Sequence, residues 1–167
     1  MIKTSNKITA LNIELAVAEL LNPRIYTIVP NVSWGLYLNH ECDMLALHKH
    51  RFTEIEIKIS ASDLKADFNK RHHHESKYIS RLVYAVPEKL KTLALELCPR
   101  DTGIIVVQWI ARYGYKASWE RTCKHDPKKD LVPLNIQSQF MRLGCIRIWT
   151  MKRKINKQIK QKELWQE

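Results

Sequence analysis

The strictest constraint on the fold of this 167-residue chain is a short alternating segment at residues 54–59. Charged and β-branched residues follow one another there without a break: Glu54, Ile55, Glu56, Ile57, Lys58 and Ile59. Side chains of a strand point to opposite faces in turn, so the three isoleucines share one face and the three charges share the other. An isoleucine face of this kind packs against a core, so the segment predicts a strand of a sheet covered on that side.

An acid on the preceding apolar run extends this strand into a candidate site. Asp43 lies in that run, and residues 48–51 form a polar link short enough for a hairpin. A hairpin would bring Asp43 beside Glu56 and Lys58, with Glu54 one pleat farther away. Two carboxylates and an ammonium at adjoining strand positions suit the binding of a hard cation with a positive charge beside it. The alternative is an edge strand with a solvated charged face, since alternation is common in strands of any function.

A capped basic helix is expected directly after this strand. Ser60 precedes Asp63 by three residues, which is the pattern of a helix N-cap with an acid in the first turn. The helix is expected to continue to Arg71, with Leu64 and Phe68 on its apolar face. Ser60 and Asp63 are therefore expected to position the helix.

The combined pattern of acid, hairpin, Glu-x-Lys strand and capped basic helix resembles the PD-(D/E)XK nuclease superfamily. Within it, residues 56–60 followed by residues 63–67 look most like the MmcB-type DNA repair family and related phage-borne nuclease-like proteins. The resemblance covers about residues 8–110. Cys42 stands where the name of the superfamily has proline, a position that shapes the strand rather than the chemistry.

The resemblance implies a metal-dependent site. Asp43 and Glu56 would bind one or two Mg²⁺ or Mn²⁺ ions, with the backbone carbonyl of Ile57 as a further oxygen ligand. Lys58 would orient the attacking water or neutralise charge at the phosphate. Glu14 lies beside Leu11 and Val17 in the apolar stripe that a helical wheel gives for a helix expected over residues 8–21. It matches an additional acid of the superfamily. Its alternative is a carboxylate hydrogen-bonded inside the core or reaching solvent at the edge of the stripe.

The remaining elements predict an α/β fold. Residues 25–38 suggest a first strand, residues 82–86 and 103–108 read as buried strands, and Pro87 opens a helix between these two. Strand, helix and strand with short joints form a crossover with parallel strands. We therefore expect a mixed β-sheet flanked by helices, in the order α-βββ-α-β. The resemblance implies the same restriction-endonuclease-like core. This core is expected over residues 1–111, with a basic helical C-terminal extension over residues 112–167.

Positive charge is concentrated in that extension. The chain carries a net charge of +11, and residues 112–162 hold fourteen Lys/Arg against three Asp/Glu. A polyanion is the expected partner, and the alternative is a solvated helix that keeps the protein in solution. Aromatic residues among the bases at 112–129 fit either base stacking or packing on the sheet edge. The side chains expected to contact phosphates are Lys65, Lys70, Arg71, Arg142, Arg147, Lys152, Arg153 and Lys154.

Histidines and cysteines give weaker signals. Successive helical side chains diverge by about 100°, so the histidines at residues 72–74 cannot all meet one ion and favour a positive surface instead. Cys123 and His125 make only a weak case for zinc, because no second ligand pair is present. Four widely spaced cysteines, no apolar run of membrane length and no signal peptide lead us to expect a cytoplasmic protein of a bacterial or phage-infected cell.

These features predict a Mg²⁺- or Mn²⁺-dependent endonuclease that hydrolyses DNA, rather than RNA, in DNA repair or phage DNA metabolism. The alternative is a nucleic-acid-binding protein with a nuclease fold and weak or absent catalysis, including a structural or packaged component of a phage. Asp43, Glu56 and Lys58 favour the enzyme, because a protein that only binds nucleic acid does not need two acids close to a phosphate.

Overall fold

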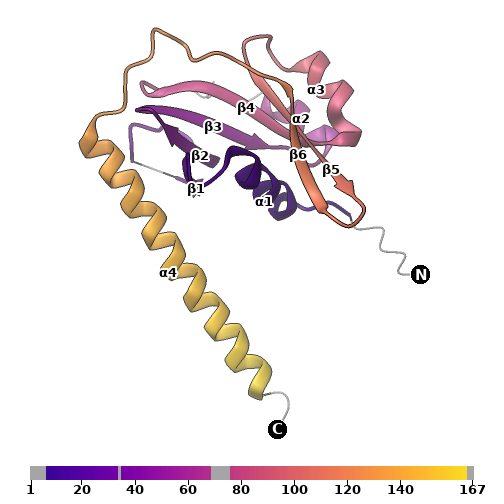
Figure 1. Ribbon diagram of the computed structural model, residues 1–167, viewed down its shortest axis with the longest axis vertical. Helices are drawn as coiled ribbons and strands as arrows, with labels where there is room; N and C mark the ends of the chain where they lie inside the picture. Colours follow the sequence, from indigo (N-terminus) through magenta and orange to yellow (C-terminus); the bar gives the residue numbers. More distant parts are fainter. Residues whose placement is uncertain (1–6, 34, 69–75, 165–167) are drawn as a thin grey trace.

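A single six-stranded sheet organises the chain (Figure 1). The computed structural model describes residues 7–33, 35–68 and 76–164, with the side chains of 162–164 left out. The strands lie in sequence order, β3, β4 and β5 are parallel neighbours, and the other adjacent pairs are antiparallel. The predicted α/β fold with a mixed sheet and α-βββ-α-β order is thereby confirmed.

The elements follow one another with short connections. Their bounds are α1 (Ala10–Leu21), β1 (Thr27–Val32), β2 (Cys42–His48), β3 (Arg51–Ile57), α2 (Ala61–Asp67), β4 (Ile79–Pro87), the 3₁₀ turn η1 (Glu88–Leu90), α3 (Lys91–Leu97), β5 (Gly103–Ile110), β6 (Gly114–Arg121) and α4 (Leu134–Leu164).

Helix α1 covers one face of the sheet. A capping box starts it, because the Thr9 hydroxyl accepts from the Asn12 N–H and the Asn12 side chain accepts from the Thr9 N–H. Ile13 and Val17 are fully buried against the sheet. The helix is rotated relative to the predicted apolar stripe: Leu11, expected to pack, is 59% exposed.

The hairpin of β2 and β3 has a two-residue turn. Lys49 and His50 have positive φ angles of 47° and 60°, as the turns that match strand twist require. On β3, Ile55 and Ile57 are buried on the face that α1 covers. The expectation that Ile59 shares this core is wrong, because β3 ends at Ile57 and Ile59 is 37% exposed.

Helices α2 and α3 cover the opposite face. The predicted cap is confirmed, since the Asp63 N–H donates to the Ser60 hydroxyl at 3.1 Å. Leu64 of α2 and Ala94 of α3 pack into a cluster with Tyr84. The charged face of β3 lies under this layer and is buried, so the alternative of a solvated charged face does not hold.

Strand β6 completes the sheet at its edge. It pairs antiparallel with β5 and is a regular strand at the start of the segment that was expected to be a basic helical extension. Tyr115 and Trp119 pack on the α1 side of the sheet, so packing rather than stacking on bases accounts for these two aromatics. Tyr113, in the turn before β6, is 70% exposed.

Helix α4 is one continuous helix that extends away from the sheet (Figure 1). Near its start, Phe140 is fully buried and meets Phe52 edge to face, with ring centroids 5.0 Å apart. Farther along, the Arg147 guanidinium donates to the Asn31 carbonyl of β1. Residues 151–161 are all exposed. None of the helices in the described ranges is long and apolar enough to cross a membrane.

Candidate functional site

Strands β2 and β3 bring Asp43 next to the Glu-x-Lys segment. Met44 pairs with Ile55, so the next positions along the hairpin are Asp43 and Glu56. One carboxylate oxygen of Asp43, Oδ2, accepts from the Ile57 N–H at 2.8 Å. The Asp43 side chain therefore takes the place of a main-chain acceptor at the end of the ladder, which fixes its carboxylate at this point of β3.

Glu56 and Lys58 belong to a buried network that reaches α2 and β4. The Lys58 Nζ atom lies 2.6 Å from Glu56 Oε2 and 2.9 Å from Asp67 Oδ1. The Tyr84 hydroxyl donates to the other Asp67 oxygen at 3.1 Å. Burial lowers the pKa of Lys58, but the Glu56 and Asp67 carboxylates outweigh it, so the pKa lies above its ordinary value. Lys58 is therefore a fixed positive charge at neutral pH.

The Glu56 carboxyl group has an unusual environment for an acid. Burial raises its pKa, the Lys58 ammonium opposes this, and Asp43 and Glu54 raise it further, to about 7. Its Oε1 atom is buried without a hydrogen-bond partner among the residues that the structure describes. A buried carboxylate with an unmatched oxygen beside a second acid fits a hard divalent cation.

Helix α1 brings a third acid to this place. Glu14 lies at the edge of the buried side of α1, partly exposed. Burial raises its pKa, and the negative charge of the Asp43 carboxylate raises it further. The roles predicted for Glu14, Asp43, Glu56, Lys58 and the Ile57 carbonyl remain predictions.

The residues predicted to contact phosphates are differently placed. Lys65 on α2 and four residues of α4 are exposed: Arg142, Lys152, Arg153 and Lys154. Arg147 is partly buried and anchors α4 on β1, which reduces its availability to a phosphate. Lys70 and Arg71 lie outside the described residues, as do the histidines at 72–74.

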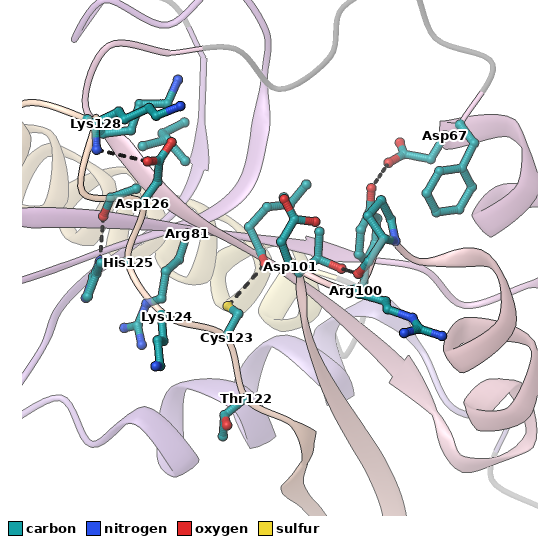
Figure 2. Close-up of a pocket in the computed structure, with 18 residues that line it drawn as sticks. Asp67, Arg81, Arg100, Asp101, Thr122, Cys123, Lys124, His125, Asp126 and Lys128 are labelled. Atoms are coloured by element: carbon teal, nitrogen blue, oxygen red, sulfur yellow. Dashed lines mark hydrogen bonds between the residues drawn. The ribbon is translucent and has the colours of Figure 1, made fainter.

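A cavity of about 920 Å³ adjoins the Lys58 network (Figure 2). Asp67 and Tyr84 line it on the α2 side, and the loop after β6 lines it opposite. Five basic side chains contribute to its wall: Arg81, Arg100, Lys124, Lys128 and Lys129. Sequence reasoning missed this cavity, because its wall combines four segments that are distant in the chain: 67–68, 79–84, 99–102 and 122–129.

Cys123 and His125 form separate hydrogen bonds in this wall. The Cys123 thiol donates to the Leu82 carbonyl, whereas His125 Nδ1 lies 2.5 Å from the Ser80 hydroxyl. Burial, then the charge of Arg81, lowers the pKa of His125 to about 4, so the ring is neutral at pH 7.

A second cluster of side chains lies beside Glu56. His40 Nε2 is 2.7 Å from Glu54 Oε1 and 3.6 Å from Cys42 Sγ. Burial and the charges of Glu54 and Glu56 raise the pKa of the Cys42 thiol. Sequence reasoning treated Cys42 as a strand-shaping position and did not consider His40. The spacing His40-x-Cys42 was the available signal.

The fold and the site together define an α/β protein with a buried acid and lysine cluster at the end of a central strand. The chain belongs to a DNA repair family, because the family model "DNA repair protein MmcB-like" matches residues 2–153. The predicted MmcB-type membership is confirmed. The chain is also similar to a solved structure, a protein of unknown function from Silicibacter pomeroyi, with a TM-score of 0.62 and 16% sequence identity. The match covers 88% of this chain and 90% of that chain. At this identity the similarity shows the fold alone. No curated protein matches the sequence significantly.

Proposed function

We propose that the chain is a metal-dependent nuclease that hydrolyses phosphodiester bonds of DNA and acts in DNA repair. One observation carries the proposal, the environment of the buried Glu56 carboxyl group beside Asp43. Its Oε2 atom accepts a hydrogen bond from the Lys58 ammonium, and its Oε1 atom has no hydrogen-bond partner among the described residues. Membership of a DNA repair family makes DNA the first substrate to test.

The acids fit a hard cation. Asp43 and Glu56, with Glu14 from α1, would hold Mg²⁺ or Mn²⁺, and the Ile57 carbonyl is the remaining oxygen donor that the strand offers. When bound, such a cation lowers the pKa of water and offsets negative charge on the scissile phosphate. It would also favour the ionised form of Glu56, whose pKa is otherwise raised to about 7.

Lys58 supplies fixed positive charge at the same place. An ammonium group has three N–H donors, and two of them face Glu56 and Asp67. The third would donate to a phosphate oxygen or to the attacking water once the substrate reaches this buried group. Asp67 acts as a positioning residue, since it holds the ammonium, and Tyr84 in turn orients the Asp67 carboxylate. Stabilisation of this kind acts on the charge that develops in the transition state.

Two basic surfaces support the binding of the substrate backbone. The exposed part of α4 presents Lys152, Arg153 and Lys154. The cavity wall adds basic side chains beside Asp67, next to the proposed reaction site. Cations of this kind bind phosphates without reading sequence.

The competing function is nucleic-acid binding with little or no catalysis. The burial of the site favours it, because Glu56 and Lys58 are each only 3% exposed and their ion pair is already satisfied in part. Both functions use the same basic surfaces, so only a catalytic assay separates them.

The test is cleavage of labelled single-stranded and double-stranded DNA and of RNA, with Mg²⁺, Mn²⁺ or EDTA. We expect cleavage of DNA only with a divalent cation. Lys58→Ala should lower the rate on the order of a hundredfold or more while the Kd for DNA barely changes. Lys91→Ala, on the surface of α3, is the matched control and should cleave like the unmodified chain. Tight binding without metal-dependent cleavage of any substrate would establish the binding function instead.

A second arm examines the basic helix. Replacing Lys152, Arg153 and Lys154 by glutamine should weaken binding and flatten its salt dependence, because each lost phosphate contact removes about 0.7–0.9 from the slope of log K against log salt. Unchanged binding in this variant would locate the nucleic acid elsewhere on the protein.

A further inference from the structure

Three side chains that commonly bind metals converge beside Glu56. His40 Nε2, Cys42 Sγ and a Glu54 carboxylate oxygen all lie within 4.8 Å of one another. Cys42 and Glu54 are fully buried, and the His40 side chain is 10% exposed. Glu54 and Glu56 are two residues apart on β3, so their Cα atoms are about 6.6 Å apart. The cluster is therefore adjacent to the proposed nuclease site but uses different side chains.

The distances suit a tetrahedral ion. Zinc bonds of about 2.3 Å to sulfur and about 2.0–2.1 Å to imidazole nitrogen place these two ligand atoms about 3.6 Å apart. The observed distance between Cys42 Sγ and His40 Nε2 is 3.6 Å. The nitrogen and a carboxylate oxygen would lie about 3.3 Å apart in the same tetrahedron. His40 Nε2 and Glu54 Oε1 now lie 2.7 Å apart, which is a hydrogen bond with a proton between the two atoms. A cation in place of that proton would widen it by about 0.6 Å.

The orientation of the imidazole supports the same interpretation. His40 Nδ1 lies 2.8 Å from Asn39 Oδ1. An amide oxygen only accepts, so Nδ1 carries its hydrogen towards Asn39 and Nε2 is the nitrogen presented to Cys42 and Glu54. Metal-binding histidines typically have such an outer hydrogen bond, which fixes the tautomer and the ring orientation.

We propose that His40, Cys42 and Glu54 bind a zinc ion at a site separate from the Mg²⁺ or Mn²⁺ site of the nuclease. A thiolate and an imidazole favour Zn²⁺ over the hard cations that Asp43 and Glu56 suit. Binding releases to solvent the thiol proton of Cys42 and the proton between His40 and Glu54. The described residues supply three ligands, so a fourth ligand, water or another group, would complete the tetrahedron. The site stands on its own geometry, independently of whether the chain cleaves DNA.

The experiment is a Co²⁺ titration of the metal-stripped full chain, followed by absorption spectroscopy. We expect one equivalent to bind with a thiolate-to-Co²⁺ charge-transfer band that Zn²⁺ abolishes and excess Mg²⁺ does not. Cys42→Ser should lack the band. Cys145→Ser, an exposed thiol of α4, should retain it. Asn39→Ala changes an exposed residue outside the cluster and should weaken Co²⁺ binding about 10–100-fold.

Several results would overturn the zinc site. They are the absence of the charge-transfer band in the unmodified chain, its persistence in Cys42→Ser, and its loss on addition of Mg²⁺. Should Cys42→Ser fail to fold, as judged by circular dichroism, Asn39→Ala decides the question: unchanged Co²⁺ affinity there means that His40 is not a ligand. In that case the three side chains form a hydrogen-bonded group only.

Discussion

The raised pKa of Glu56 predicts that the carboxyl group weakens the fold as the pH rises. In the folded chain this pKa is about 7, against an ordinary value of 4.5. The folded state therefore holds the proton over a pH range in which the unfolded chain has released it. The stability contributed by this group is fully present below pH 4.5 and is lost as the pH rises through 7. Linkage with these two values gives a loss on the order of 2–3 kcal/mol between pH 5 and pH 8.

Glu56→Gln removes the titration but keeps the shape and one acceptor oxygen. The assay is urea unfolding of both proteins at pH 5, 6, 7 and 8 in EDTA, because bound metal would stabilise the ionised form. The difference in unfolding free energy between the variant and the unmodified chain should shift in favour of the variant by about 2–3 kcal/mol from pH 5 to pH 8. Taking this difference cancels the titration of all other groups that the substitution leaves unchanged.

Glu19→Gln is the matched control, because Glu19 forms an exposed ion pair with Lys116. Its unfolding free energy should follow the unmodified chain within about 0.5 kcal/mol at every pH. If Glu56→Gln also runs parallel to the unmodified chain, the ion pair with Lys58 keeps the pKa of Glu56 near its ordinary value, and the reasoning from burial fails.

Three further substitutions test the packing described above by urea unfolding at pH 7. Lys58→Met should lower the unfolding free energy by about 3–5 kcal/mol, because it removes the ammonium that pairs with both buried carboxylates, Glu56 and Asp67; a loss below about 1 kcal/mol would contradict this. Phe140→Ala should cost about 3–5 kcal/mol by removing the anchor of α4, whereas the exposed Ile159→Ala should cost less than about 1 kcal/mol, and equal losses would refute the anchoring role. Gly103→Ala should cost about 1–3 kcal/mol, since its Cβ would lie 3.1–3.2 Å from three packed side chains, and a neutral effect would mean that these side chains move easily.

The strand prediction was most accurate where the sequence has a two-residue alternation and no competing helical pattern. The alternation of residues 54–59 specified the face of Ile55 and Ile57, because a period of two admits only one assignment of sides. It did not specify what covers the other face, because that depends on where α2 packs. Lys58 is buried with the Asp67 carboxylate of α2 as its partner. This contact depends on the packing of the helix on the sheet, which local sequence patterns do not show.

The failures have physical reasons of the same kind. A helical wheel places side chains around an axis but does not show which side the sheet covers, and Leu11 was therefore assigned to the wrong side of α1. Strand β6 had a signal in the alternation of Tyr115, Ala117 and Trp119, but the basic residues over 112–129 suggested a segment of the phosphate-binding extension instead. The cluster of His40 with Glu54 joins residues fourteen positions apart, and only the pairing of β2 with β3 brings them together.

The contact between Asp43 and the Ile57 N–H also affects how relatives of this chain are to be interpreted. The same carboxylate is both a candidate metal ligand and the acceptor that completes the end of the β2–β3 ladder. A relative without the proposed catalysis would still need a hydrogen-bond acceptor for the Ile57 N–H to keep its hairpin. Substitution of this aspartate would therefore be slow even in such a relative. An aspartate at this position is therefore a poor marker of an active member. Glu56 is the better one, because its Oε1 atom accepts no hydrogen bond from the described residues and therefore completes no ladder as Asp43 does.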